Sequence, residues 1–254
     1  SLTYAPTASA SGTLALNFSY LDNAGTAQTG TVNIAYAASI QHAYVSDANN
    51  GLYMCSMDPT AGTLANCQTT GGGFNGAWSV AFFSGSTANY AYVVDGPRTN
   101  IYLCTVNSDG TLSNGCAVQG SGYDYPEHVT VLGSTLYAAD QGSPGGGEVT
   151  VCNISSTDGT LSGCFVTASA GGLNYASGVA LGGDFGYVAT DNNGLFTCAF
   201  DSIAGALTNC AVAATSSSVS DAWNVVISGG IAYFANAESG LTACAIGSGG
   251  DLSS

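Results

Sequence analysis

Ala91-Tyr92-Val93-Val94-Asp95 is a short apolar stretch that occurs, with small changes, five times along the chain. Each copy has a tyrosine at its second position and is followed by a cysteine eight to twelve residues further on. Short apolar runs bounded by turn-forming residues are typical of buried β-strands. The other four copies occupy residues 43–47, 136–140, 186–190 and 232–236.

The cysteines give the period of this repeat. Eight of the nine form pairs separated by twelve positions, and the first members of successive units lie 46 to 49 residues apart. A period of this length is typical of one blade of a β-propeller. The cysteines are Cys55 with Cys67, Cys104 with Cys116, Cys152 with Cys164, Cys198 with Cys210, and Cys244.

Each cysteine pair encloses a turn-rich segment, such as residues 58–62, flanked by apolar alternation, which predicts a β-hairpin. Cysteines that face each other on antiparallel strands can form a disulfide. We therefore expect four disulfides within the blades and an unpaired Cys244. Zinc binding is the competing interpretation, but the closely spaced cysteines of zinc sites are absent from the sequence. Disulfides predict an extracellular or cell-surface location.

Alignment of the units on their cysteines predicts four antiparallel strands in each. In the second unit these strands are residues 78–83, 90–95, 101–106 and 116–119. The predicted fold class is all-β, with a β-propeller of about five four-stranded blades over residues 39–254. The last blade is expected to stop after its third strand. The blades form either a five-bladed ring or part of a larger one.

The second strand of each unit reads Tyr-Val-x-Asp/Asn or a close variant and resembles the YVTN-type β-propeller repeat of bacterial surface and secreted proteins. The resemblance covers about residues 39–254. It departs from the family in blade number, because relatives usually have around seven. Such propellers include surface-layer and adhesion proteins and overlap with a lactonase-like fold, so the resemblance implies a fold and not one activity.

Residues 1–38 do not follow the repeat. Two runs of alternating apolar and polar residues flank a polar turn at 22–28, which predicts a β-hairpin. This hairpin resembles the closing strands of the immunoglobulin-like modules that precede some bacterial propellers. A lone hairpin is not stable, so we expect it to dock on the propeller, on an upstream part or on another copy, giving a homopolymer. The alternating apolar residues are Leu14, Leu16, Phe18, Tyr20, Val32, Ile34 and Tyr36.

Charge excludes two classes of partner. The 254 residues include one Arg, no Lys and 16 acidic residues, for a net charge of −15. Such a chain cannot neutralise the phosphates of nucleic acid or an anionic membrane surface. The chain also has no run of 18 apolar residues, so no membrane insertion is expected.

The ligand site of a propeller lies at the mouth of the central channel, where loops enter the innermost strands. In the aligned units Trp78, Glu127 and Trp223 share one position of these loops. The favoured interpretation is that both tryptophans plug the channel as core residues, and the alternative is a sugar platform, since flat aromatic rings beside carboxylate and amide groups suit a sugar. The candidate ligand-binding residues are Trp78, Asp124, Tyr125, Glu127, His128, Tyr175, Asp221, Trp223 and Asn224.

Catalytic and metal sites have weaker support in the sequence. Glu127 and His128 could form an acid–base pair of a lactonase-like site, but adjacent strand residues point to opposite faces, which favours structural roles. Asp47, Asn49 and Gly51 resemble part of a calcium loop, but a turn role is the simpler explanation and is favoured. We expect no metal and no cofactor.

These observations predict a non-catalytic extracellular module, and not an enzyme, that binds a protein or a glycan at the cell surface. One alternative is a structural subunit of an extracellular filament or surface layer, assembled by β-strand addition through the N-terminal hairpin. A second alternative is a lactonase-like hydrolase.

Overall fold

The structure is a computed structural model that describes most of the chain. Within the described part every regular element is a β-strand, and no helix is long and apolar enough to cross a membrane. The all-β propeller predicted from the repeat is therefore confirmed. The described residues are 10–21, 23–38, 41–58, 61–96, 99–119, 123–142, 146–168, 173–191, 194–213, 221–236 and 240–253.

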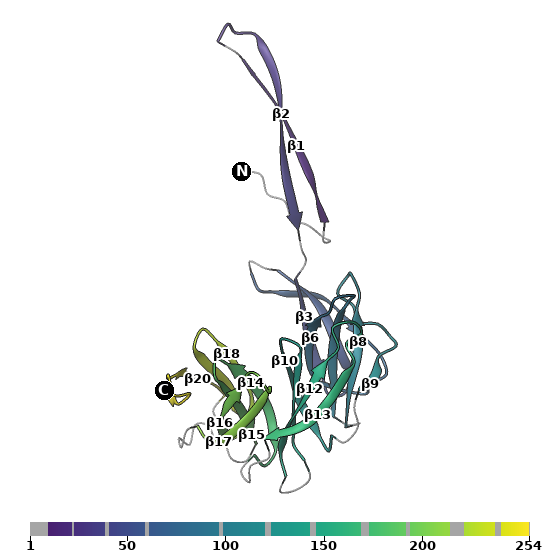
Figure 1. The fold of residues 1–254 in the computed structure, drawn as a ribbon. Helices are drawn as coiled ribbons and strands as arrows, with labels where there is room; N and C mark the ends of the chain where they lie inside the picture. Colours follow the sequence, from purple (N-terminus) through teal and green to yellow (C-terminus); the bar gives the residue numbers. More distant parts are fainter. Residues whose placement is uncertain are drawn as a thin grey trace. The chain divides into compact units, whose positions relative to one another are not determined.

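The N-terminal segment forms the predicted hairpin (Figure 1). Strands β1 (Ala10–Leu21) and β2 (Ala27–Ala38) pair antiparallel in a two-stranded sheet, with Leu14 opposite Ile34. The side chains of the apolar stripe up to Phe18 lie outside the described residues, while Tyr20 is exposed. By its internal contacts, the chain divides into residues 1–43 with 54–68 and residues 44–53 with 69–254, each a compact unit.

Five antiparallel blades follow the hairpin. The first has three strands in the described part, at the second, third and fourth positions of the repeat. The fifth has a short fourth strand, where the sequence predicted an end after the third. The first blade contains β3 (Gln41–Asp47), β4 (Gly51–Met57) and β5 (Leu64–Thr70); the fifth contains β18 (Ala222–Ser228), β19 (Ile231–Asn236), β20 (Gly240–Ile246) and β21 (Leu252–Ser253).

The second, third and fourth blades each have four strands in sequence order. Their innermost strands are β6 (Ala77–Ser84), β10 (Pro126–Leu132) and β14 (Ala176–Gly182). The second strands are β7 (Asn89–Asp95), β11 (Thr135–Asp140) and β15 (Phe185–Thr190). The outer pairs are β8 (Asn100–Val106) with β9 (Ala117–Gln119), β12 (Glu148–Ile154) with β13 (Leu161–Ala168), and β16 (Gly194–Asp201) with β17 (Ala206–Val212).

The repeated tyrosine connects one blade to the next. Tyr92 and Tyr187 are fully buried in second strands, and the hydroxyl of Tyr92 donates a hydrogen bond to the Gly159 carbonyl of the following blade at 2.6 Å. Gly159 has φ +73°, and a Cβ there would lie 2.7 Å from the Tyr90 ring. Tyr187 makes the same contact with the Gly250 carbonyl at 3.0 Å. The apolar cores accordingly contain residues of two successive blades.

The four predicted disulfides are present, and Cys244 is free and buried. Each bridge joins the third strand of a blade to its fourth strand or, at Cys116, to the residue directly before that strand, with Cα–Cα distances of 4.0 to 4.4 Å. Four disulfides are compatible with an extracellular or periplasmic protein. The bridges are Cys55–Cys67, Cys104–Cys116, Cys152–Cys164 and Cys198–Cys210.

Candidate functional site

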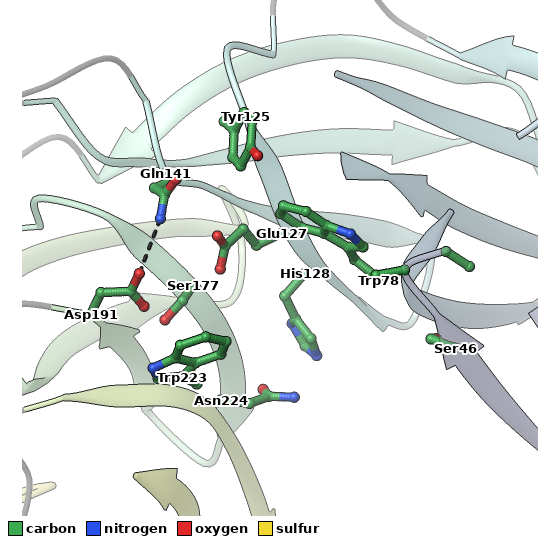
Figure 2. Close-up of a pocket in the computed structure, with 12 residues that line it drawn as sticks. Ser46, Trp78, Tyr125, Glu127, His128, Gln141, Ser177, Asp191, Trp223 and Asn224 are labelled. Carbon is green, nitrogen blue, oxygen red and sulfur yellow. Dashed lines mark hydrogen bonds between the residues drawn. The ribbon is translucent and has the colours of Figure 1, made fainter. Parts of the chain in front are cut away.

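A pocket of about 610 Å³ opens where the innermost strands begin (Figure 2). Strands β6, β10, β14 and β18 are successive neighbours, and the first residues of each bring side chains to the same end of the blades. The lining residues are Ser46, Ala48, Ala77, Trp78, Tyr125, Glu127, His128, Gln141, Ser177, Asp191, Trp223 and Asn224.

Six of the nine candidate ligand-binding residues line this pocket: Trp78, Tyr125, Glu127, His128, Trp223 and Asn224. The other three lie outside its lining. Asp124 is exposed, and its backbone N–H donates to Asp140. The Tyr175 carbonyl accepts a hydrogen bond from the Asp191 N–H, and Asp221 acts on Asp191 through its charge. A role in binding a ligand stays a prediction for all nine.

Two polar residues of the pocket, Gln141 and Asp191, were missed in the sequence. Both occupy the position directly after the last residue of a second strand, and Ala48 has the same position in the first blade. The predicted second strands end one residue before these positions. The position directly after each aligned strand would have revealed these pocket residues, which we call the second row.

The second row is held in place by the residue that ends the strand. In the third blade Asp140 is buried, and its carboxylate accepts hydrogen bonds from the N–H groups of Asp124, Tyr125 and Gly142 at 2.7 to 3.0 Å. These bonds fix the loop that enters β10 and the turn that carries Gln141. Asp47 likewise accepts from the N–H groups of Asn49 and Asn50, the turn role weighed against calcium.

The pocket concentrates negative charge at Glu127 and Asp191. Figure 2 shows the Glu127 carboxyl group pointing toward Ser177 and Asp191. Burial, together with the charges of Asp191 and Asp140, raises the pKa of Glu127 to about 7. Burial and the charge of Asp221 also raise the pKa of Asp191. A carboxyl group that titrates near neutral pH can both accept and return a proton, as a general base requires.

The Gln141 amide and the Ser177 side chain act on the Asp191 carboxyl group. The Gln141 side-chain N–H donates to Asp191 Oδ2 at 3.0 Å (Figure 2). Among the described residues, Asp191 Oδ1 is buried and has no hydrogen-bond partner, and the same holds for the Trp78 indole nitrogen. Buried polar groups without partners are costly, so a donor and an acceptor beside the pocket favour the entry of water or a hydroxylated ligand.

Aromatic side chains form two walls of the pocket. The rings of Trp78 and Tyr125 meet edge to face with their centroids 5.2 Å apart. Gly96 makes room for the Trp78 indole, since a Cβ there would lie 2.2 Å from a ring atom. Trp223 is 57% exposed and therefore does not plug the channel as a core residue. The tryptophans offer apolar faces beside carboxyl and amide groups, an arrangement suited to a small organic ligand.

His128 does not act with Glu127. Its ring points away from the Glu127 carboxyl group in Figure 2, and its Nδ1 accepts a hydrogen bond from the Val179 N–H at 3.4 Å. Burial lowers the pKa of His128 to about 4, so the ring is neutral at pH 7. The prediction that these two adjacent side chains do not converge agrees with this geometry.

No group of three or more His, Cys, Asp or Glu residues that could hold a metal ion is found in the part of the chain that the structure describes. The site therefore offers a carboxyl pair, two amides and aromatic walls. Fold and site together define a β-propeller with a polar pocket at the channel mouth.

Comparison with known proteins supports a propeller repeat protein. The model of the LVIVD repeat matches residues 174–197 and 220–246, which lie in the fourth and fifth blades. No curated protein sequence matches the chain.

Solved structures share the fold at low sequence identity. A proposed 6-phosphogluconolactonase from Bacteroides fragilis is 16% identical with a TM-score of 0.56, covering 94% of this chain and 80% of its own. One from Bacteroides uniformis is 15% identical with a TM-score of 0.59, covering 94% and 76%. The WD40 repeats of RRP9 are 12% identical with a TM-score of 0.53, covering 84% and 62%. These similarities show the propeller fold.

The comparisons correct the functional prediction. The expectation of a non-catalytic module that is not an enzyme is contradicted, because structures similar to this chain are described as lactonases. The prediction rested on the absence of known catalytic motifs, and a hydrolytic site whose residues come from separate blades leaves no such motif. Sequence identities of 15% and 16% show the fold alone.

Proposed function

We propose that the pocket hydrolyses an uncharged lactone, with Glu127 as the general base. The observation that carries this proposal is the Glu127 carboxyl group, which faces a 610 Å³ pocket and has its pKa raised to about 7. A base whose pKa is close to the working pH combines a large ionised fraction with useful proton affinity. The lactonase-like structural neighbours agree with this chemistry.

The reaction consumes one water molecule. The Glu127 carboxylate takes a proton from water while the water oxygen forms a bond to the lactone carbonyl carbon, and the carbonyl electron pair moves onto its oxygen. Collapse of this tetrahedral intermediate breaks the ring C–O bond. The proton held by Glu127 then passes to the departing ring oxygen, which gives the open-chain hydroxy acid and restores the carboxylate.

Other pocket residues orient the lactone. The side chains of Trp78 and Asn224 carry N–H donors at the pocket wall, and such donors stabilise the negative charge that develops on a carbonyl oxygen. Asp191, fixed by Gln141, accepts hydrogen bonds from a hydroxyl group of the ligand. The rings of Trp78 and Trp223 cover the apolar parts of the lactone.

The charge of the chain selects against phosphorylated substrates. Among the described residues, the lining of the pocket contains no Lys or Arg, and the chain carries a net charge of −15. Its single Arg, Arg98, lies outside the described residues. A phosphate group would meet Glu127 and Asp191 with no counter-charge from the pocket lining, so we propose a neutral lactone as substrate.

Lactone hydrolysis by the purified chain tests this function. We expect turnover of δ-valerolactone or D-glucono-1,5-lactone and much slower turnover of the 6-phosphorylated gluconolactone. Glu127→Gln should lower kcat/KM by about 100-fold or more, the usual cost of removing a general base. Glu148→Gln, which changes a glutamate outside the pocket, is the matched control. Absence of lactone turnover, or full activity of Glu127→Gln, would overturn the proposal.

The disulfides also bear on the cellular location of the protein. We also propose that the protein acts outside the cytosol at the cell surface, as the Tyr-Val-x-Asp/Asn repeats of YVTN-type proteins suggest, and that β1 and β2 are closing strands of an immunoglobulin-like module. The four bridges support an oxidising compartment. Cell fractionation and surface labelling of the native host test this location.

A further inference from the structure

A second cavity of about 440 Å³ lies along the innermost strands. Its described walls come from the middle residues of β6, β10, β14 and β18, and the one ionisable side chain among them is His128, which is neutral at pH 7. Eleven of the thirteen lining residues are aliphatic or aromatic. The lining residues are Val80, Ala81, Phe82, His128, Val129, Thr130, Val131, Val179, Ala180, Leu181, Val225, Val226 and Ile227.

Side chains cover three backbone N–H groups in these walls. The Val129 N–H donates to Ser79 Oγ at 3.3 Å, and the Val179 N–H donates to His128 Nδ1 at 3.4 Å. Ser79 and His128 occupy the same position in successive blades, each serving the blade that follows. These donors are therefore not available to a polar ligand, and the cavity presents a largely apolar surface.

The third backbone N–H group, that of Val225, is also covered by a side chain. Gly178 has the corresponding position in the fourth blade but no side chain to offer, and the Val225 N–H instead donates to Asn224 Oδ1 at 2.7 Å. A Cβ at Gly178 would lie 2.8 Å from that oxygen. The glycine thus leaves room for Asn224 to cover the donor from its own blade.

His128 lines both cavities, so the two are adjacent. One ligand can therefore place a polar part beside Glu127 and an apolar part along the innermost strands. Within the second cavity Phe82 is 41% exposed and Val226 is 55% exposed, so apolar surface is open to a ligand there. Removing such surface from water is favourable in proportion to its area.

From this arrangement we propose that the substrate is a lactone that bears an alkyl chain. The lactone ring occupies the polar pocket, and the chain lies in the apolar cavity against Phe82 and Val226. This inference rests on the proposed lactone hydrolysis and names its substrate class. A lactone whose substituents are all polar has no apolar part to place in this cavity, so it gains nothing from burying apolar surface there.

Chain length is the direct test. A series of δ-lactones from δ-hexalactone to δ-dodecalactone keeps the ring constant and adds methylene groups. We expect kcat/KM to rise by up to about fourfold for each added methylene until the cavity is full. D-Glucono-1,5-lactone should be a poorer substrate than δ-decalactone.

A variant locates the effect. Val226 is half exposed, so Val226→Asp should fold, and a charge in the cavity should remove the dependence of kcat/KM on chain length. Ile203→Asp is the matched control, because Ile203 is 98% exposed and does not line the cavity. Val226→Ser, with a melting curve for each variant, replaces Val226→Asp where that variant does not fold.

Binding of 1-alkanols, measured by titration calorimetry, examines the cavity without catalysis. Affinity that rises from 1-hexanol to 1-decanol in the parent, and does so less in Val226→Asp, supports the inference. If no lactone is hydrolysed, the proposed function fails whatever the alkanols do. If lactones are hydrolysed at rates independent of chain length, or alkanols bind without dependence on length, the alkyl-chain inference is overturned and the proposed function stands.

Discussion

Glu127 sets the pH dependence of the proposed reaction. Its pKa is raised to about 7 by burial and then by the charges of Asp191 and Asp140. The carboxylate is the active form, so kcat/KM should increase with pH up to about 7 and level off above it.

Asp191→Asn provides the first prediction at the residue scale. Removing the charge of Asp191 lowers the pKa of Glu127, because an adjacent negative charge opposes ionisation. The midpoint of the kcat/KM profile should therefore move to lower pH, measured with δ-valerolactone. Asp184→Asn, an exposed residue in the turn between β14 and β15, is the control and should leave the midpoint in place. An unchanged midpoint in Asp191→Asn would show that Glu127 is not the titrating base.

His128 gives the second prediction, on stability. Its pKa falls from the usual 6.5 to about 4 on folding, so between these values the unfolded chain binds a proton that the folded chain does not. Stability is therefore fully present above about pH 6.5 and falls as the pH decreases toward 4, by up to about 3 kcal/mol.

His128→Asn removes this titration while an amide oxygen can still accept from the Val179 N–H. Urea unfolding at pH 7, 5.5 and 4 should show a smaller loss of stability on acidification than in the parent. The difference between the two proteins isolates His128, since their other titratable groups are the same. Equal losses would place the acid sensitivity elsewhere.

The residues of the pocket show what one sequence can reveal. Trp78, Glu127 and Trp223 could be found because they stand at one aligned position before a recognisable strand. Asp191 lies 64 positions from Glu127 and follows a different strand, so only the register of the blades brings the two carboxyl groups into one pocket. The pKa of Glu127 could not be predicted either, because it depends on burial and on that neighbour.

At the scale of elements, the repeat was readable because each part has a local signal. Apolar strands and turns rich in Gly, Asn and Asp alternate along the chain, and the predicted second-blade strand 90–95 differs from β7 (Asn89–Asp95) by one residue. The innermost strand of this blade, predicted at 78–83, is β6 (Ala77–Ser84), which is one residue longer at each end.

The third prediction concerns the loop that enters β10. Asp140→Ala removes the acceptor of three backbone N–H groups, which are left without their partner beside the pocket. We expect a loss of about 2 to 3 kcal/mol in unfolding free energy, measured in urea, because hydrogen bonds to a charged acceptor are among the stronger ones. KM should also rise, since the same loop carries Tyr125 and leads to Glu127.

Asp184→Ala is the comparison for Asp140→Ala, since it removes an exposed aspartate at a turn between strands. It should change the unfolding free energy by no more than about 0.5 kcal/mol. Similar losses in both variants would mean that the Asp140 hydrogen bonds do not hold the loop.

For the whole molecule, the sequence predicted the propeller because blades are joined by neighbour contacts that repeat. The same tyrosine–glycine hydrogen bond links the first blade to the second through Tyr44 and Gly110, and the fourth to the fifth through Tyr187 and Gly250. Such contacts leave a periodic trace in the sequence. An activity leaves no comparable periodic pattern in the sequence, since different blades supply different side chains to the one pocket.

The N-terminal hairpin carries the last prediction. Strands β1 and β2 form a two-stranded sheet, and an isolated hairpin of this kind is marginally stable in water. Its apolar residues, Leu14, Leu16 and Phe18 among them, therefore need a partner surface to pack against. If that surface belongs to another copy, the contact is heterologous and can extend into a homopolymer.

Deletion of residues 1–38 should then abolish self-association, because it removes the strands that make the contact. The blades should stay folded, because they keep their own cores and disulfides. Sedimentation velocity over a range of concentrations measures the association, and circular dichroism checks that the blades remain folded. Leu16→Asp within the full chain is a milder variant that should weaken association through the same strand. A parent that stays monomeric at high concentration, or a deletion variant that associates as the parent does, would show that the hairpin does not link copies, since a contact made by the hairpin cannot form without it.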